Sequence, residues 1–262
     1  MPELPDLQVF SMNLKKHILN KPIVSAAVHN SSKMNVLSDV FANGLINSHI
    51  VDIERVGKEL YFHLSNGNVF SVHLMLNGQF KLSDAEKVGS IQHKIISIGF
   101  QDNSALSVSD YQSLCKVTFN PKKSSVPDAL SEKFDYAYFA GVAGRNSRMN
   151  VKAFLIDQKI LKGIGNAYAD EILWKADISP ESVVGRIPEE ALSGLFSAIG
   201  DVLRDAIDNI LKIAPDIISG EERGFLKVHN PRKKATEEGD PILVKEIATK
   251  RTYYTKKQRL FI

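Results

Sequence analysis

Cysteine is almost absent from this sequence, and long apolar runs are missing altogether. The single cysteine, Cys115, excludes an internal disulfide and excludes a zinc site built from four cysteines. No apolar run reaches the roughly 18 residues of a membrane-spanning helix, and no basic stretch followed by an apolar one marks a signal peptide. We therefore expect a cytoplasmic protein without a membrane partner.

The charge of the chain is small and unevenly distributed. The net charge of +3 is too low to indicate nucleic-acid binding by itself. Residues 222–262, however, contain eleven Lys or Arg and five Asp or Glu, which gives them a net charge of +6. The net charge of the preceding residues is therefore −3. A basic end on a near-neutral body indicates a localised anionic partner, although a solvated tail would have the same composition.

The first 130 residues read mainly as short antiparallel strands. An N-terminal helix over residues 6–19 is predicted from Leu7, Phe10, Leu14 and Ile18, which recur at helical spacing. Runs rich in β-branched and aromatic residues then predict strands, with a hairpin turn at 65–68, over residues 51–56, 60–64, 69–74 and 95–100. Several short strands with turn signals favour a sandwich.

The predicted secondary structure changes twice in the rest of the chain. The polar, proline-flanked segment 121–127 is interpreted as a linker, and residues 128–215 read as helices with one apolar stripe from Leu192 to Ile210. Residues 222–262 return to strand-like texture, with a turn at 237–240 that predicts a β-hairpin. We expect an α+β fold with domains at 1–130, 131–221 and 222–262.

The N-terminus carries a candidate nucleophile. Removal of Met1 would leave Pro2 with a free secondary amine, which can attack an electrophilic carbon to form a Schiff base. The adjacent carboxylate of Glu3 can supply or take the proton. Taken alone, the same residues are also compatible with an ordinary turn-prone start of a chain.

A second informative segment lies between Lys152 and Glu171. There Gly163-Ile-Gly-Asn166 interrupts a helical pattern and predicts a tight junction between two helices. Asn166 is placed to cap the second helix, whose first amides would face an anion such as a DNA phosphate.

Together these two segments resemble the formamidopyrimidine-DNA glycosylase and endonuclease VIII family. The start Pro-Glu-Leu-Pro is similar to one family signature, and residues 152–171 are similar to its helix–two-turns–helix motif. The matching residues are Asp157, Gly163, Gly165, Asn166, Tyr168, Ala169 and Glu171, with Ser179-Pro180 following. The resemblance implies an N-terminal β-sandwich with a flanking helix, a helix–two-turns–helix domain, a C-terminal β-hairpin finger, and DNA held in a cleft.

The resemblance also assigns roles to individual residues. Pro2 would attack C1′ of a damaged nucleotide and displace the base, with Glu3 as general acid and base. Lys58 would contact phosphate near the lesion, and Lys152 and Asn166 would bind phosphates from the helical domain. Such contacts hold the duplex in register without reading its sequence.

Several positions depart from the family pattern. Asp6 stands where most relatives carry Glu, and Leu76 stands where a Met often fills the gap left by the flipped base. Gln112 replaces the Arg that reads the orphaned base, and Leu114 replaces a Phe wedge. We therefore expect an opposite-base preference that is looser than, or different from, that of the 8-oxoguanine enzymes.

The finger also departs from the pattern. The two Cys-x-x-Cys pairs that hold zinc in the family are Ala235-Thr-Glu-Glu238 and Thr255-Lys-Lys-Gln258 here. Such residues do not hold a metal in that geometry, so we expect a zincless finger, from which Lys250 or Arg251 enters the minor groove. Cys115 is interpreted as a buried small residue.

The function implied is base-excision repair by a bifunctional DNA glycosylase and apurinic/apyrimidinic (AP) lyase. We expect it to act as a monomer, without cofactor or metal, on double-stranded DNA with damaged bases or abasic sites in a bacterial cytoplasm, in association with the nucleoid. Two alternatives are a non-catalytic damaged-DNA-binding protein of the same fold and an interaction protein of the translation apparatus. The segment 216–224, expected to face the lesion, does not identify the base.

Overall fold

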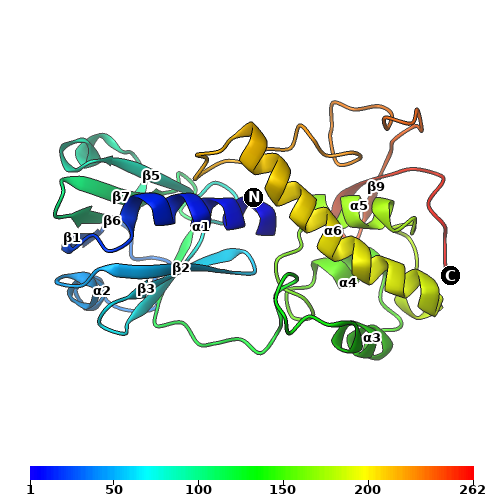
Figure 1. Cartoon of the computed structure of the whole chain (residues 1–262), viewed down its shortest axis with the longest axis horizontal. Coiled ribbons are helices and arrows are strands. Elements are labelled where there is room, and N and C mark those ends of the chain that lie inside the picture. Colours follow the sequence, from blue (N-terminus) through cyan, green and yellow to red (C-terminus); the bar gives the residue numbers. More distant parts are fainter. The chain divides into compact units, whose positions relative to one another are not determined.

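The computed structural model describes the whole chain from Met1 to Ile262. It forms two compact units, each containing residues from two stretches of the sequence (Figure 1). Unit 1 comprises Met1–Lys123 and Ile210–Glu221, and unit 2 comprises Ser124–Asn209 and Glu222–Ile262. None of the helices combines the length and the apolar character needed to cross a membrane.

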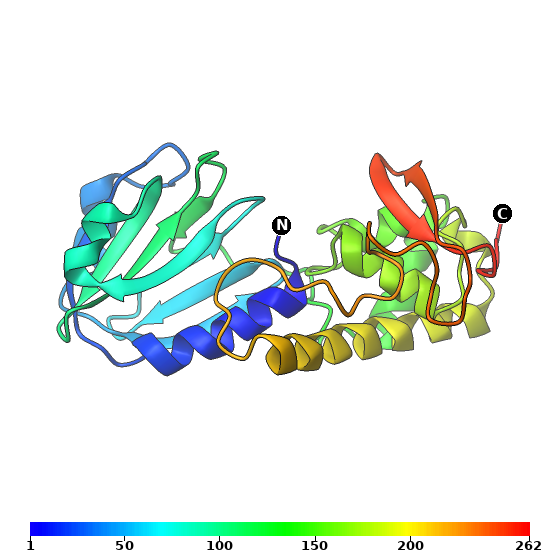
Figure 2. The ribbon, with the colours of Figure 1, turned by 90° about the horizontal axis from the view of Figure 1, so that it is seen from above.

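Unit 1 is the expected antiparallel sandwich of two four-stranded sheets, which Figure 2 shows face to face. One sheet has the order β1 (Ile23–Val28), β6 (Lys94–Phe100), β7 (Ser104–Ser109) and β5 (Gln79–Asp84). The other has the order β2 (Ile50–Val56), β3 (Glu59–Leu64), β4 (Val69–His73) and β8 (Lys116–Phe119). Helix α2 (Ser38–Leu45) and the 3-10 turn η1 (Ala85–Ser90) complete the unit. The core is aromatic, with the rings of Phe62 and Phe70 stacked 4.5 Å apart.

Helix α1 (Leu4–Ile18) runs antiparallel to strand β2. The predicted apolar stripe is confirmed, since Leu7, Phe10, Leu14 and Ile18 are all buried. Three contacts between the helix and the strand show this direction: Gln8 with Arg55, Ser11 with Ile53, and Lys15 with Asp52. Residue numbers increase along the helix while those of the contacted strand residues decrease. The N-terminus of α1 therefore lies at the end of unit 1 where β2 finishes.

Unit 2 contains α3 (Tyr136–Arg145), α4 (Val151–Ile156), α5 (Asn166–Lys175), the 3-10 turn η2 (Val184–Arg186) and most of α6 (Glu189–Ile213). The apolar stripe predicted along α6 is confirmed by its fully buried residues, Leu195, Ile199, Leu203 and Ile210. A two-stranded sheet of β9 (Leu243–Ile247) and β10 (Lys250–Tyr254) forms the finger (Figure 2).

The finger hairpin exists, but its turn was predicted at the wrong place. The chain reverses at Ala248 and Thr249, between Ile247 and its partner Lys250. The segment 237–240 forms a separate turn, closed by a bridge between Ala235 and Pro241. The two turn residues have φ of 51° and 59°, whereas two-residue hairpin turns usually use Asn-Gly for this conformation. An Ala-Thr pair therefore carries no turn signal in the sequence.

Replacing Ala248 by Asn and Thr249 by Gly should stabilise the finger. A left-handed conformation costs an ordinary L-residue roughly 1–2 kcal/mol, and Asn and Gly carry much less of this cost. We expect amide hydrogen exchange in β9 and β10 to slow by about tenfold. Thr249→Val is the matched control, because it keeps the β-branch, and unchanged exchange in the Asn-Gly variant would contradict the turn assignment.

Candidate functional site

The turn that carries Lys58 lies at the same end of unit 1 as the start of α1. Val56 pairs with Glu59, which leaves Gly57 and Lys58 as the two turn residues. Gly57 has a φ of 62°, a conformation that glycine adopts without strain. Arg55 ties this turn to α1, because its Nε donates to Gln8 at 2.9 Å and its Nη1 donates to the Gly57 carbonyl at 3.2 Å.

The two N-terminal carboxylates are engaged in starting α1. Glu3 is the N-cap residue and forms a capping box with Asp6, whose carboxylate accepts from the Glu3 amide at 2.8 Å. Both residues are nearly inaccessible, at 4% and 1% exposed. The shorter side chain of Asp6 therefore suits a capping role. Pro2 is buried beside them, and the ammonium group of Met1 forms an ion pair with Glu221.

Two loops at the same end carry the residues predicted to fill the gap left by a flipped base. Loop A (residues 74–78) connects β4 to β5, and loop B (residues 110–115) connects β7 to β8. The register pairs His73 with Lys116 and Gln79 with Ser109, so each loop begins where the other ends. Leu76 on loop A is 56% exposed, and on loop B Gln112 is exposed and Leu114 half-buried.

His73 connects these loops electrostatically to the Lys58 turn. Burial lowers the pKa of the His73 imidazole; neighbouring Glu59 raises it, and neighbouring Lys58 and Lys116 lower it. The ring Nδ1 lies 3.0 Å from the Met75 amide, from which it accepts a hydrogen bond. Unit 1 thus brings together all its predicted site residues, Pro2, Glu3, Asp6, Lys58, Leu76, Gln112 and Leu114, although their roles stay predictions.

In unit 2 the glycine-rich junction joins two helices as predicted, but Gly165 and not Asn166 is the N-cap of the second helix, and no side chain caps it. Helix α4 ends at Ile156 and α5 begins at Asn166, with Gly163 at a φ of 106° between them. Gln158 holds the intervening turns, because its side chain donates to the carbonyls of Ile156 and Ile164 and accepts from the Gly163 amide. Sequence inspection did not single out Gln158.

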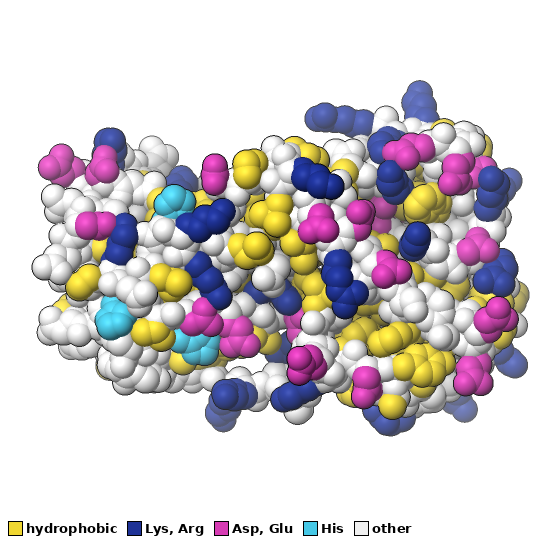
Figure 3. All heavy atoms as spheres, viewed as in Figure 1, with side chains coloured by type: hydrophobic (Ala, Val, Ile, Leu, Met, Phe, Trp, Pro, Cys, Tyr) yellow, Lys and Arg dark blue, Asp and Glu magenta, His cyan; other side chains and the backbone are white.

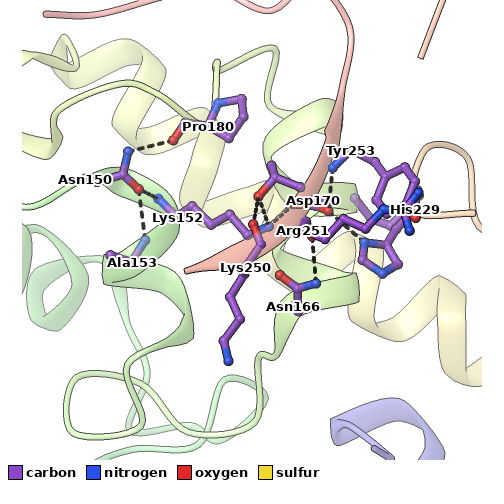
Figure 4. A network of polar contacts seen from close by, with 12 residues as sticks. Asn150, Lys152, Ala153, Asn166, Asp170, Pro180, His229, Lys250, Arg251 and Tyr253 are labelled. Atoms are coloured by element: carbon purple, nitrogen blue, oxygen red, sulfur yellow. Dashed lines mark hydrogen bonds and ion pairs between the residues drawn. The ribbon is translucent and has the colours of Figure 1, made fainter. Parts of the chain in front are cut away.

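Lys152 does not occupy the place that a phosphate contact requires. It is 0% exposed, and its Nζ donates at 2.6 Å to both Asp170 Oδ1 and Thr252 Oγ1 (Figure 4). A buried ammonium that is already paired with a carboxylate does not reach a phosphate in solvent. The structure therefore corrects the expected phosphate contact and gives Lys152 the task of holding α4, α5 and strand β10 together.

Two adjacent carboxylates on α5 anchor the chain that leads into the finger. Asp170 accepts from His229 Nδ1 at 2.7 Å and from the Tyr253 amide at 2.9 Å (Figure 4). Glu171 accepts from three consecutive amides at 2.7–2.8 Å, those of Lys227, Val228 and His229. Burial raises the pKa of Glu171, and these three donors oppose the shift. Asp170 and His229 were not predicted as anchoring residues. The signal for Asp170 was its place in an acidic pair within an otherwise apolar helix.

Replacing Lys152 by Met should destabilise unit 2 strongly. The change leaves the Asp170 carboxylate buried without its ammonium partner, and breaking a buried pair in this way costs about 3–5 kcal/mol. Urea unfolding would measure the loss. The double variant Lys152→Met with Asp170→Asn should recover part of it, because neither charge is then left unpaired.

The salt dependence of DNA binding separates this structural role from a phosphate contact. Loss of one phosphate contact lowers the slope of log K against log salt by about one. We expect Lys152→Met to leave that slope unchanged, and a reduction of about one would restore the phosphate-contact interpretation.

The other predicted DNA-binding residues of unit 2 meet where α5 begins beside β10. Asn166 Nδ2 donates to the Arg251 carbonyl at 2.9 Å, while its Oδ1 is buried without a partner. Lys250 and Arg251 are exposed, and the Lys250 side chain extends away from the network (Figure 4). These three residues fit a phosphate-binding role, which stays a prediction. Charge alone does not outline the surface, because basic and acidic side chains are interspersed on the face in Figure 3.

Hydrogen bonds hold the finger at the positions where the family has zinc ligands. Thr255 and Gln258 are 2% and 7% exposed. Gln258 Oε1 accepts from the Thr255 amide and its Nε2 donates to the Ile178 carbonyl, both at 2.8 Å. In the other segment the Thr236 amide donates to the Asp240 carbonyl at 2.9 Å. At the four positions only Glu238 is of a zinc-ligand type, whereas Ala235, Thr255 and Gln258 are not. One carboxylate does not make a zinc site, so the donor set does not fit the metal.

Replacing Gln258 by Ala should loosen the finger. The Thr255 amide and the Ile178 carbonyl would lose their partner while buried, at a cost of about 1–3 kcal/mol each. Thermal unfolding and hydrogen exchange at residues 250–261 would detect the change. A metal chelator is the complementary test, and we expect it to alter neither the melting temperature nor the activity.

Comparison with known proteins agrees with this architecture. The chain matches the formamidopyrimidine-DNA glycosylase N-terminal domain over residues 1–117 and the formamidopyrimidine-DNA glycosylase H2TH domain over residues 126–214. The formamidopyrimidine-DNA glycosylase of Mycoplasma genitalium is 29% identical, covering 94% of this chain and 91% of the relative. That of Mycobacterium leprae is 30% identical over 79% of this chain and 77% of the relative. That of Ureaplasma parvum is 34% identical over 69% of each.

Solved structures share the fold over nearly the whole chain. The Lactococcus lactis Fpg in complex with abasic-site DNA superimposes with a TM-score of 0.85 at 21% identity, covering 97% of this chain and 98% of that one. A structure of MutM with DNA containing carbocyclic 8-oxo-G gives a TM-score of 0.85 at 23% identity, with the same coverage. The two matched domains place this chain in the formamidopyrimidine-DNA glycosylase family, and, since its finger positions carry no cysteine, it is a zincless-finger member.

Proposed function

We propose that this protein is a base-excision DNA glycosylase that also cleaves the strand as an AP lyase. The observation that carries the proposal is the meeting of Pro2 and Glu3, at the start of α1, with the Lys58 turn at one end of unit 1. A nucleophile, a proton-transfer group and a cation are the groups needed to displace a base from a deoxyribose held by its phosphates.

The chemistry begins with the amine of Pro2, once Met1 has been removed. With Met1 attached, the Pro2 nitrogen is an amide and has no nucleophilic lone pair. The free amine attacks C1′, the bond from C1′ to the base breaks, and the carboxyl group of Glu3 supplies and takes protons. The bond from C1′ to the ring oxygen O4′ then breaks, O4′ takes a proton, and the Pro2 nitrogen forms a double bond to C1′. This iminium acidifies the C2′ protons, so loss of one of them expels the 3′ phosphate and cleaves the strand.

The protein holds its DNA as a monomer and without a cofactor in this proposal. Asn166, Lys250 and Arg251 contact phosphates from unit 2, and the two loops that carry Leu76, Gln112 and Leu114 enter the gap that the extruded base leaves. Extrusion costs a few kcal/mol and is easiest for a damaged base. The candidate substrates are ring-opened purines, oxidised pyrimidines and 8-oxoguanine, since neighbouring structures of the fold contain DNA with FAPY-dG, an oxidised pyrimidine or carbocyclic 8-oxo-G.

Borohydride trapping on duplexes tests the proposal. Protein lacking Met1 is incubated with a duplex that carries an abasic site or one of these bases, and the iminium is reduced to a stable adduct. We expect an adduct with the abasic duplex and with at least one damaged base. No adduct on any duplex, with binding to abasic DNA retained, would show a damage-recognition protein without chemistry, for which the substitutions at Asp6, Gln112 and Leu114 would account.

A further inference from the structure

Loops A and B form one structural unit. Both cross between the two sheets of unit 1 at the same end, because His73 pairs with Lys116 and Gln79 pairs with Ser109. They are joined directly by the Asn77 amide, whose Nδ2 donates to Gln112 Oε1 at 2.5 Å. Side chains near the middle of the two loops are therefore presented together.

The backbone of loop B is fixed from within by a buried carboxylate. Asp110 is 2% exposed and accepts from the amides of Gln112, Leu114 and Cys115 at 2.9, 2.7 and 2.8 Å. Ser113, with a φ of 54°, also accepts from Asn30 through its hydroxyl at 3.0 Å. A loop held by so many hydrogen bonds presents its outward side chains with little loss of entropy on binding.

Loop A is similarly constrained. The Gly78 amide donates to the Leu74 carbonyl at 2.9 Å, and a Cβ at Gly78 would lie only 2.3 Å from that oxygen. The amide of Met75, whose φ is 55°, donates to His73. Leu76 therefore stands on a tight turn rather than on a flexible segment.

Among the large apolar or aromatic side chains of loops A and B, that of Tyr111 is the most exposed. It is 63% exposed, compared with 56% for Leu76, whereas Leu114 is half-buried. The structure shows neither a ring contact nor a hydrogen bond for its side chain. Gln112, which was predicted to read the orphaned base, already accepts a hydrogen bond from Asn77 through its Oε1. Tyr111 is thus the unpartnered aromatic group on a rigid tip.

We propose that Tyr111 stacks on a base of the duplex beside the position that the extruded nucleotide vacates. The inference rests on the proposed function and names the group that fills the gap. A vacated position exposes the flat faces of the bases next to it, and an aromatic ring covers such a face with a gain that is independent of sequence. Tyr111 takes the wedge role that was predicted for Leu114, whose half-buried side chain offers less surface.

The test uses a duplex in which 2-aminopurine, whose fluorescence falls when it is stacked, lies directly next to a tetrahydrofuran abasic analogue. We expect Tyr111→Ala to weaken binding of this duplex by about tenfold, within the range measured for loss of one base–aromatic contact, and to abolish most of the quenching. Tyr111→Phe should retain both, because it keeps the ring. Leu37→Ala, which shortens another exposed apolar side chain of unit 1, should behave as wild type.

The outcomes distinguish this inference from the proposed function. Wild-type affinity and quenching in Tyr111→Ala would overturn the stacking role, and an equal loss in Tyr111→Phe would transfer the effect to the hydroxyl and also overturn it. Equal weakening on undamaged duplex would show a contact that does not depend on a vacated position. Borohydride trapping by the wild-type protein is read separately, so absence of chemistry leaves the binding comparison decisive for Tyr111.

Discussion

Replacing Pro2 by Gly should lower Schiff-base trapping and base excision by about 10²-fold or more. Glycine keeps an N-terminal nitrogen but loses the ring that fixes its direction, and a displacement of about 1 Å at a reacting atom is enough for such a loss. Pro2 is buried next to the Glu3 N-cap, so the ring is held by its surroundings. Single-turnover trapping and excision on the same damaged duplex would measure both effects.

The control for this variant is the affinity for a duplex with a tetrahydrofuran abasic analogue, which cannot form an iminium. We expect Pro2→Gly to bind it nearly as wild type, since the nucleophile supplies little of the binding energy. Full trapping by Pro2→Gly, or by protein that retains Met1, would show that another amine performs the attack.

Replacing Glu3 by Gln should separate base excision from strand cleavage. Loss of a positioned acid and base removes about 10²–10⁴-fold from a step that needs proton transfer. Expulsion of the base is such a step, whereas the aldehyde of a preformed abasic site already presents an electrophilic carbon. We therefore expect excision of a damaged base to fall by about 10²-fold or more, while trapping on an abasic duplex falls by less.

The substitution is suited to this test because glutamine keeps most of the capping geometry at the start of α1. The Glu3 amide still donates to Asp6, and the amide oxygen of glutamine still accepts from the first turn. Circular dichroism and thermal unfolding would verify that the helix persists. An equal loss on both substrates would place Glu3 in the attack on C1′ itself rather than in proton transfer to the base.

The regular elements were predictable because their periodicity is local. Helix α1, the stripe of α6 and the four predicted strands, β2, β3, β4 and β6, bury most of the apolar residues that their spacing marks, whereas β1, β5, β7 and β8 were not predicted. The finger turn was misplaced because Ala248 and Thr249 lack the usual residues for a left-handed turn. Pairing of the flanking strands holds these two residues in the left-handed conformation, and the residue types at the turn do not indicate it.

Candidate site residues could be named from the sequence only where the type and position of a residue themselves suggest chemistry. Pro2, Glu3 and Lys58 were singled out because their types and positions suit a reaction, and their roles stay predictions. Lys152 was misassigned, since its partner Asp170 lies on another helix and Asp170 in turn contacts Tyr253, which is 83 residues away. Long-range pairing decides whether a lysine reaches solvent, and no local pattern encodes it.

The hydrogen-bonded finger has a consequence for the conditions under which this protein works. Thiolate ligands are oxidised to sulfenic and higher acids, which release the metal that they hold. Here Thr255 and Gln258 take those positions, and the only thiol, Cys115, is buried with its pKa raised to about 12 by burial and by Asp110. Peroxide, which produces damaged bases, thus finds neither a reactive thiolate nor a metal cluster in this finger. We expect metal starvation and oxidative stress to leave the affinity of this protein for DNA unchanged.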